Sequence, residues 1–198
     1  MPAARESLLE AAGAALAARP WRAVRMVDVA AAAGVSRQTL YNEFGGKHGL
    51  GRALVRRETD RFLAGVDRAL DLPAPPAERL AALADWTVTA ARTHPVVRAL
   101  LTGCWSDALP APEAGFPAPR LPGAVPAEPG ALTRAVRDRA AAALGPLHAS
   151  PGHCELVVRL ALSYVVAPAE EPAEPVLDHL LGAFSAPSPT AAGRSPRR

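Results

Sequence analysis

Residues 36–47, SRQTLYNEFGGK, concentrate side chains whose types suit contact with DNA. A helix over these residues turns Leu40 and Phe44 inward, because they lie four positions apart. The outward face then carries Arg37, Gln38, Thr39, Tyr41 and Asn42. In the major groove, arginine can pair with guanine, and glutamine or asparagine can pair with adenine. The pattern therefore predicts a helix that reads DNA bases.

Two short helices around a tight Gly-Val-Ser turn are expected to position this face. Apolar residues recur at helical intervals before the turn: Met26, Val29, Ala30 and Ala33. Gly34 supplies the left-handed residue that ends the first helix, and Ser36 is a good N-cap for the second. We expect the second helix over Arg37 to Phe44. The pattern is that of a helix-turn-helix with its recognition helix.

The rest of the chain also predicts an all-α protein. The hydrophobic fraction of 49% is largely alanine, and strand-forming residues occur only in short groups. Trp21 and Val24 are expected to fill the small core beneath the helix-turn-helix. Further helices are expected over residues 5–18, 47–70, 77–93, 95–106, 131–144, 152–167 and 175–184, which makes about nine in all. Residues 109–130 hold seven prolines in 22 positions and are expected to form a mobile loop.

Charge divides unevenly along the chain. Residues 1–61 carry ten Arg or Lys against six Asp or Glu, a balance of +4. Residues 62–193 carry nine against thirteen, a balance of −4, and the tail RSPRR adds +3. This division favours a polyanionic partner for the first segment alone, although balances this small also arise by chance.

Other features exclude several classes of protein. Cys104 and Cys154 have no CxxC or CxxH companion, so we expect no metal site and no disulfide, and both thiols as small apolar residues. No residue run is long and apolar enough to cross a bilayer, and the first residues do not form a signal peptide. We therefore expect a protein of the cytoplasm that does not bind membranes.

The chain resembles the tetracycline-repressor (TetR) family of bacterial transcription regulators. The resemblance rests on LLEAA, on D-V-A-x-x-A-G-V-S from Asp28 to Ser36, on T-L-Y-x-x-F from Thr39 to Phe44, and on Lys47. It is specific over residues 5–62, and over residues 73–198 it rests on helix number and order. It implies a DNA-binding head (1–62) joined by a long fourth helix to an effector-binding and dimerisation domain (63–186), with a disordered tail (187–198).

The resemblance also implies which side chains meet DNA. The base readers would be Gln38, Thr39 and Asn42, with Arg37 shared between base and phosphate. The phosphate ligands would be Ser36, Tyr41 and Lys47. The alternative for Tyr41 is a partly buried packing residue, and His48 is expected to be only a solvated residue. Where relatives often cap the second helix with Ser or Thr, this chain has Arg25-Met26. Arg25 can replace that phosphate contact, but the cap is lost.

In the family, the last two long helices form a four-helix bundle between two copies of the chain. The apolar spacing here supports a homodimer, because one face of residues 152–167 can pack internally while another meets a partner. The expected interface residues are Leu156, Leu160, Tyr164, Leu177, Leu180, Leu181 and Phe184. A wholly internal core helix is the alternative. Two recognition helices about one DNA turn apart (~34–36 Å) would read a palindromic operator.

The resemblance further implies a pocket for a small hydrophobic or aromatic effector of unknown identity. Its candidate walls are Trp86, Leu100, Leu101, Cys104, Trp105, Arg137 and Leu162. For each of these residues taken singly, ordinary core packing is the better interpretation.

We therefore expect a ligand-responsive repressor, with no cofactor and no catalytic residues. The five histidines are scattered, and no HExxH, G-x-S-x-G or P-loop motif is present. The alternative is a helical protein-interaction module whose helix-turn-helix does not bind DNA.

Overall fold

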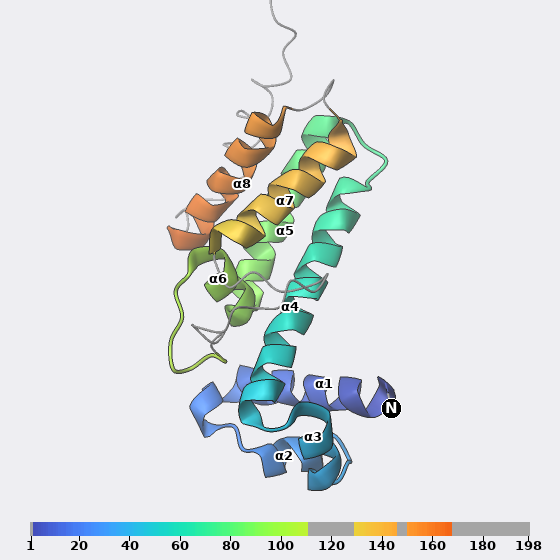
Figure 1. Ribbon diagram of the computed structural model, residues 1–198. Helices are drawn as coiled ribbons and strands as arrows, with labels where there is room; N and C mark the ends of the chain where they lie inside the picture. Colours follow the sequence, from blue (N-terminus) through green and yellow to red (C-terminus); the bar gives the residue numbers. More distant parts are fainter. Residues whose placement is uncertain (1, 111–128, 146–149, 168–198) are drawn as a thin grey trace, which may run out of the picture.

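A computed structural model describes residues 2–110, 129–145 and 150–167. These residues form eight α-helices and one 3-10 turn, and no strand occurs in those three ranges (Figure 1). The elements are α1 (Pro2–Ala18), η1 (Trp21–Ala23), α2 (Met26–Ala32), α3 (Arg37–Phe44), α4 (Lys47–Leu70), α5 (Pro76–Thr93), α6 (Pro95–Thr102), α7 (Pro129–Leu144) and α8 (Pro151–Val166). The prediction of an all-α protein with an N-terminal helix-turn-helix is confirmed.

The sequence placed both ends of α3 and α4 correctly, but it made α6 too long. We expected α6 to reach residue 106, whereas it ends at Thr102 because Gly103 adopts a left-handed conformation with φ +74°. The expected helix over 175–184, the tail from 187 and most of the proline-rich stretch lie outside the described residues. No described helix is long and apolar enough to span a membrane.

The first four helices form a small head at one end of the molecule. In Figure 1, α1 crosses the start of α4, and α2 and α3 lie below it. Trp21 and Val24 are buried in the core of this head, as the sequence predicted. Leu40 and Phe44 are buried there too, so the inward face of α3 is also confirmed. The core otherwise consists of Leu8, Leu9, Ala12, Val29, Ala30, Leu50 and Leu54.

The long helix α4 connects the head to a bundle of α5, α6, α7 and α8 (Figure 1). Its 24 residues extend about 36 Å. Its buried hydrophobic side chains up to Leu54 belong to the core of the head. Those from Val55 onward belong to the core of the bundle. A single rigid helix thus contributes to both cores.

The packing of α4 against α5 depends on one close approach. Gly65 faces the indole ring of Trp86, and a Cβ at Gly65 would overlap that ring. The indole Nε1 of Trp86 donates a hydrogen bond to the Phe62 carbonyl oxygen at 3.0 Å. The rings of Phe62 and Trp86 are stacked, with centroids 6.5 Å apart. The absence of a side chain at Gly65 is what lets the tryptophan lie against α4.

Candidate nucleic-acid interface

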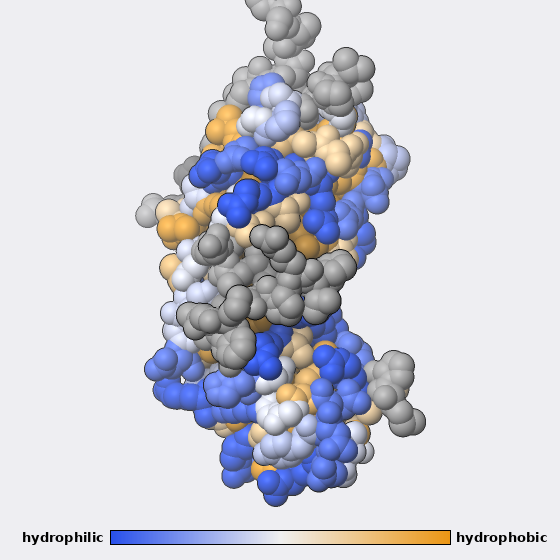
Figure 2. Space-filling view, in the orientation of Figure 1, coloured by the Kyte–Doolittle hydropathy of each residue, from blue (hydrophilic) through white to orange (hydrophobic). Residues whose placement is uncertain are grey.

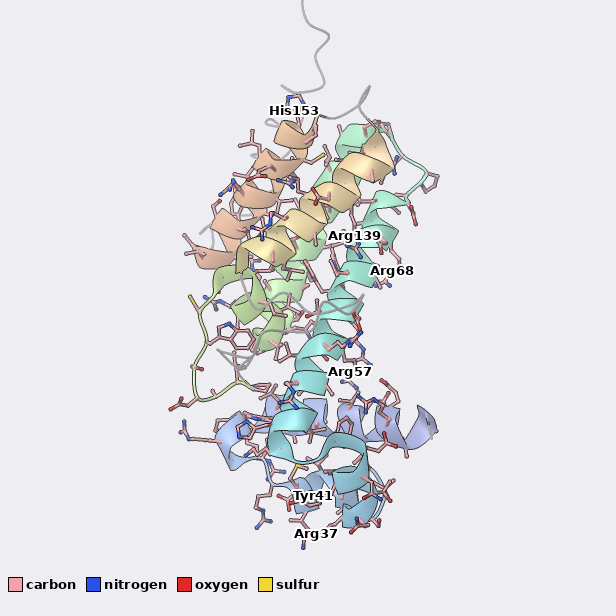
Figure 3. The ribbon with its side chains drawn as sticks, viewed as in Figure 1. Arg37, Tyr41, Arg57, Arg68, Arg139 and His153 are labelled. Atoms are coloured by element: carbon pink, nitrogen blue, oxygen red, sulfur yellow. The ribbon has the colours of Figure 1, made fainter. Side chains whose placement is uncertain are left out.

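The outer face of α3 presents polar side chains to solvent at the end of the molecule opposite the bundle. Arg37, Gln38 and Asn42 are exposed, and Tyr41 is 42% exposed, so its ring does not fill the core. Figure 3 shows Arg37 and Tyr41 at this lower end. Figure 2 shows that the same end is largely hydrophilic on the face in view. The head therefore holds a polar helix at its surface, fixed by apolar contacts behind it.

Ser36 fixes the start of this helix through its side chain. Its Oγ accepts a hydrogen bond from the backbone N–H of Thr39 at 3.0 Å, and the two hydroxyl groups lie 2.8 Å apart. An N-cap of this kind satisfies a backbone donor that the helix itself cannot satisfy. Thr39 is half-buried, unlike the other predicted base readers. The hydroxyl groups of Ser36 and Thr39 therefore already serve the local fold in the absence of DNA.

Gln38 and Asn42 form a pair on the exposed face of α3. The amide nitrogen of Gln38 donates a hydrogen bond to the side-chain oxygen of Asn42 at 2.8 Å. Residues four apart on a helix are neighbours, and this contact holds both flexible side chains in one arrangement. Two of the predicted base readers are thus brought together before any ligand binds.

Lys47, at the start of α4, is held against the η1 turn. Its Nζ donates a hydrogen bond to the Arg22 carbonyl oxygen at 3.0 Å and lies 5.6 Å from the centroid of the Trp21 ring. The lysine is half-buried, whereas the neighbouring His48 is exposed, as predicted. The sequence indicated a role for Lys47 in DNA binding. It did not indicate the hydrogen bond to Arg22, because that contact joins residues 25 positions apart.

Arg25 lies before α2 and is engaged by an acidic neighbour. Its Nε and one terminal nitrogen donate to the two carboxylate oxygens of Asp28, at 3.0 and 2.8 Å. These hydrogen bonds raise the pKa of Arg25 and are the main cause of the lowered pKa of Asp28. Arg19 adds a third contact to Asp28 at 3.3 Å. No side chain caps α2, as the Arg25-Met26 sequence implied.

A charged network behind the head was not anticipated from the sequence. Glu6 of α1 contacts Arg57 and Arg61 of α4, at 3.3 and 3.4 Å. Glu58 lies 3.6 Å from His94. In the described ranges, Arg57 Nε is the one buried side-chain polar atom without a hydrogen-bond partner. Figure 3 shows Arg57 on α4 near α1, so the network ties α1 to the long helix.

Comparisons with known proteins match this architecture. The family described as bacterial regulatory proteins, tetR family, matches residues 8–54, which include α2, α3 and the start of α4. This part of the chain is similar to the N-terminal part of TetR-family regulators. The HTH-type transcriptional regulator AlkX of Mycobacterium tuberculosis is 46% identical over 67 residues, which are 34% of this chain. The aligned residues span 32% of the length of that relative.

Solved structures of TetR-family regulators share the fold of the whole chain. One from Streptomyces coelicolor has a TM-score of 0.56 at 21% identity and covers 93% of this chain and 79% of its own. One from Rhodococcus sp. RHA1 has a TM-score of 0.51 at 20% identity, with coverage of 93% and 96%. These matched proteins are named as transcriptional regulators. In the part of the chain that the structure describes, no three His, Cys, Asp or Glu residues are grouped to hold a metal ion.

The predicted pocket residues lie in different environments. Leu100 and Leu101 are buried in the core of the bundle, and three others pack against that core from partly buried positions: Trp86, Trp105 and Leu162. Arg137 is engaged by Asp138 and Glu155. Cys104 is exposed, so its expected apolar role is wrong, because Gly103 ends α6 before it.

Cys154 is buried as expected, and burial raises the pKa of its thiol.

The predicted interface residues on α8 differ in exposure, and Leu160 packs against the core of the bundle. Leu156 is exposed, and Leu160 and Tyr164 are partly buried. The opposite face of α8 is buried: Cys154, Val157, Val158, Ala161 and Val165. In Figure 2, hydrophobic surface is visible on the side of the molecule where α8 lies. The other predicted interface residues, Leu177, Leu180, Leu181 and Phe184, lie outside the described residues.

Proposed function

We propose that this chain is a TetR-family regulator that binds double-stranded DNA through α3 and regulates transcription as a homodimer. The observation that carries the proposal is the exposed polar face of α3, with Arg37 beside the joined amides of Gln38 and Asn42. These are the side chains whose geometry suits guanine and adenine edges in the major groove. Contacts to the phosphate backbone of DNA would fix the register of the helix, and they would come from Arg25, Ser36, Tyr41 and Lys47.

A homodimer is supported by two large hydrophobic side chains on the outer side of α8. Leu156 and Val166 are exposed there although both are large and hydrophobic. A two-fold axis along this face would pair identical surfaces and set two heads about one DNA turn apart, ~34–36 Å. The operator would then be palindromic.

Repression relieved by a small hydrophobic effector is the regulatory mode that we propose. An effector acts only if it binds the form released from DNA more tightly than the bound form. Candidate contacts lie in the bundle, among Trp86, Trp105 and Leu162, which pack against its core from partly buried positions. Because it would regulate genes, the chain would act in the cytoplasm.

The test is selection of bound duplexes from a random DNA pool by the full chain, followed by titration at several salt concentrations. We expect a palindromic site, and an affinity that falls steeply with salt because phosphate contacts release counterions. The Gln38→Ala, Asn42→Ala double variant should retain weak, salt-dependent binding but lose the preference for the site. If the chain enriches no duplex and shows no salt-dependent binding, the head is a protein-interaction module instead.

A further inference from the structure

The segment that follows α6, residues 103–110, contacts both cores, and we call it the strap. In Figure 1 it descends from α6 toward the head. Trp105 and Leu109 are partly buried against the core of the bundle. The backbone N–H of Leu109 donates to the Ser106 carbonyl oxygen at 2.9 Å, which closes a turn in the strap. One side of the strap is therefore anchored on the bundle.

The other side of the strap is anchored on the head. The backbone N–H of Trp21 donates a hydrogen bond to the Ala108 carbonyl oxygen at 2.8 Å. Pro110 is buried next to Gly51 of α4. A Cβ at Gly51 would lie 3.1 Å from Pro110 Cβ and 3.2 Å from Trp21 Cζ2. The strap, Trp21 and α4 thus pack so closely that an additional methyl group would require its neighbours to shift by a few tenths of an ångström.

The η1 turn, which is hydrogen-bonded to the strap, also contacts Lys47. The Trp21 ring lies 5.6 Å from Lys47 Nζ, and the next carbonyl, that of Arg22, accepts its hydrogen bond. A lysine has a long, flexible stem, and fixing its ammonium group in advance reduces the entropy lost when it binds a phosphate. Movement of the η1 turn would therefore change where this positive charge lies.

We infer that the strap is a positioning element for DNA binding. By holding the η1 turn, it sets the place of the Lys47 ammonium group and ties this phosphate contact to the packing of the bundle. It is a second connection between bundle and head, separate from the continuous helix α4. The inference rests on the proposed DNA-binding function.

The test loosens the strap in the full chain with Pro110→Gly, and with Gly51→Ala as a milder second variant. Pro73→Gly, in the exposed turn after α4, is the matched control. With a duplex selected by the unaltered chain, we expect both strap variants to weaken binding about 2- to 12-fold, the factor for losing the preorganisation of one long side chain. The Pro73→Gly variant should bind as the unaltered chain does.

A second arm separates positioning from simple loss of stability. In a Lys47→Ala background, Pro110→Gly should cause no further loss of affinity, whereas in an Arg37→Ala background it should cause its full loss. An equal loss in both backgrounds, or no loss in either, would overturn the inference.

A third arm does not depend on DNA. The side-chain protons of Lys47 should show an NMR ring-current shift from Trp21 that decreases in the Pro110→Gly and Gly51→Ala variants. An unchanged shift would overturn the positioning role. If the unaltered chain bound no DNA, the proposed function would fail, and this shift would still decide whether the strap sets the position of Lys47.

Discussion

Gln38 Nε2 donates a hydrogen bond to Asn42 Oδ1 at 2.8 Å, across one turn of α3. Each amide keeps polar capacity beyond this bond, because Gln38 retains its carbonyl oxygen and Asn42 its two N–H donors. The pair can therefore offer an acceptor and donors to a base edge from a fixed arrangement. In the proposed DNA complex, the contact would make the two residues act as one unit.

Single substitutions of this pair should not be independent. We expect Gln38→Ala and Asn42→Ala each to weaken binding to the selected duplex by about 1–3 kcal/mol. The double variant should lose less than the sum, because each single change also releases the partner side chain. Quantitative titration of the four chains measures this coupling, and strictly additive losses would contradict it.

Removal of the Ser36 cap should destabilise the head. Ser36→Ala leaves the Thr39 N–H without its acceptor, and we expect a loss of about 0.5–2 kcal/mol in the free energy of unfolding. Ser150→Ala is the matched control, because Ser150 caps α8 in the same way at 3.3 Å from the His153 nitrogen. Both variants should unfold more readily in denaturant, but only Ser36→Ala should also weaken DNA binding. Equal DNA affinities for the two variants would argue against a local role of Ser36 at the interface.

Asp28→Asn should free Arg25 for a phosphate. Loss of the carboxylate removes the two charge-assisted hydrogen bonds that engage the guanidinium group. At neutral pH we expect tighter DNA binding by Asp28→Asn, because the Arg25 charge is no longer shared with a carboxylate, whereas Arg25→Ala should lower the salt slope by ~0.9, about one phosphate contact. An unchanged slope would show that Arg25 does not reach the DNA backbone.

The same carboxylate gives a signed pH dependence of stability. Because the pKa of Asp28 is lowered in the folded state, its contribution is present above the ordinary aspartate pKa. That contribution is lost as pH falls through the lowered pKa. Melting temperatures measured down this acidic range should fall further for the unaltered chain than for Asp28→Asn, and parallel curves would contradict the assignment.

Two glycine-to-alanine changes in helices should have opposite effects. Gly65→Ala must displace the Trp86 ring, so we expect a loss of about 1–3 kcal/mol and altered tryptophan fluorescence. At Gly152 in α8 the nearest atom to a new Cβ is Ser150 Oγ at 3.7 Å. Gly152→Ala should therefore stabilise the chain by about 0.4–1 kcal/mol. Denaturant unfolding checks both signs, and a neutral Gly65→Ala would contradict the close packing of α4 against α5.

A charge on the uncovered face of α8 should prevent dimerisation. Leu156 is 46% exposed, and Leu72, in the turn after α4, is 43% exposed and serves as the matched control. We expect Leu156→Lys to shift the chain toward a monomer in sedimentation velocity, because a buried, unpaired ammonium group is strongly unfavourable. Leu72→Lys should leave the mass unchanged. A dimer that survives Leu156→Lys would place the two-fold axis elsewhere.

The sequence by itself determined the helix-turn-helix. Gly34, Ser36 and the four-residue spacing of Leu40 and Phe44 fix α3 through contacts between near neighbours, so a reading of local pattern suffices. Signals of this range also placed both ends of α4.

Only the tertiary structure decided how the head is held. The contact of the Lys47 ammonium group with the Trp21 ring and the hydrogen bond from Trp21 to Ala108 join residues far apart in the chain. The same is true of the ion pair between Glu6 and Arg57. Such contacts depend on how whole helices pack, because close packing, and not the spacing of residues along the chain, brings these side chains together.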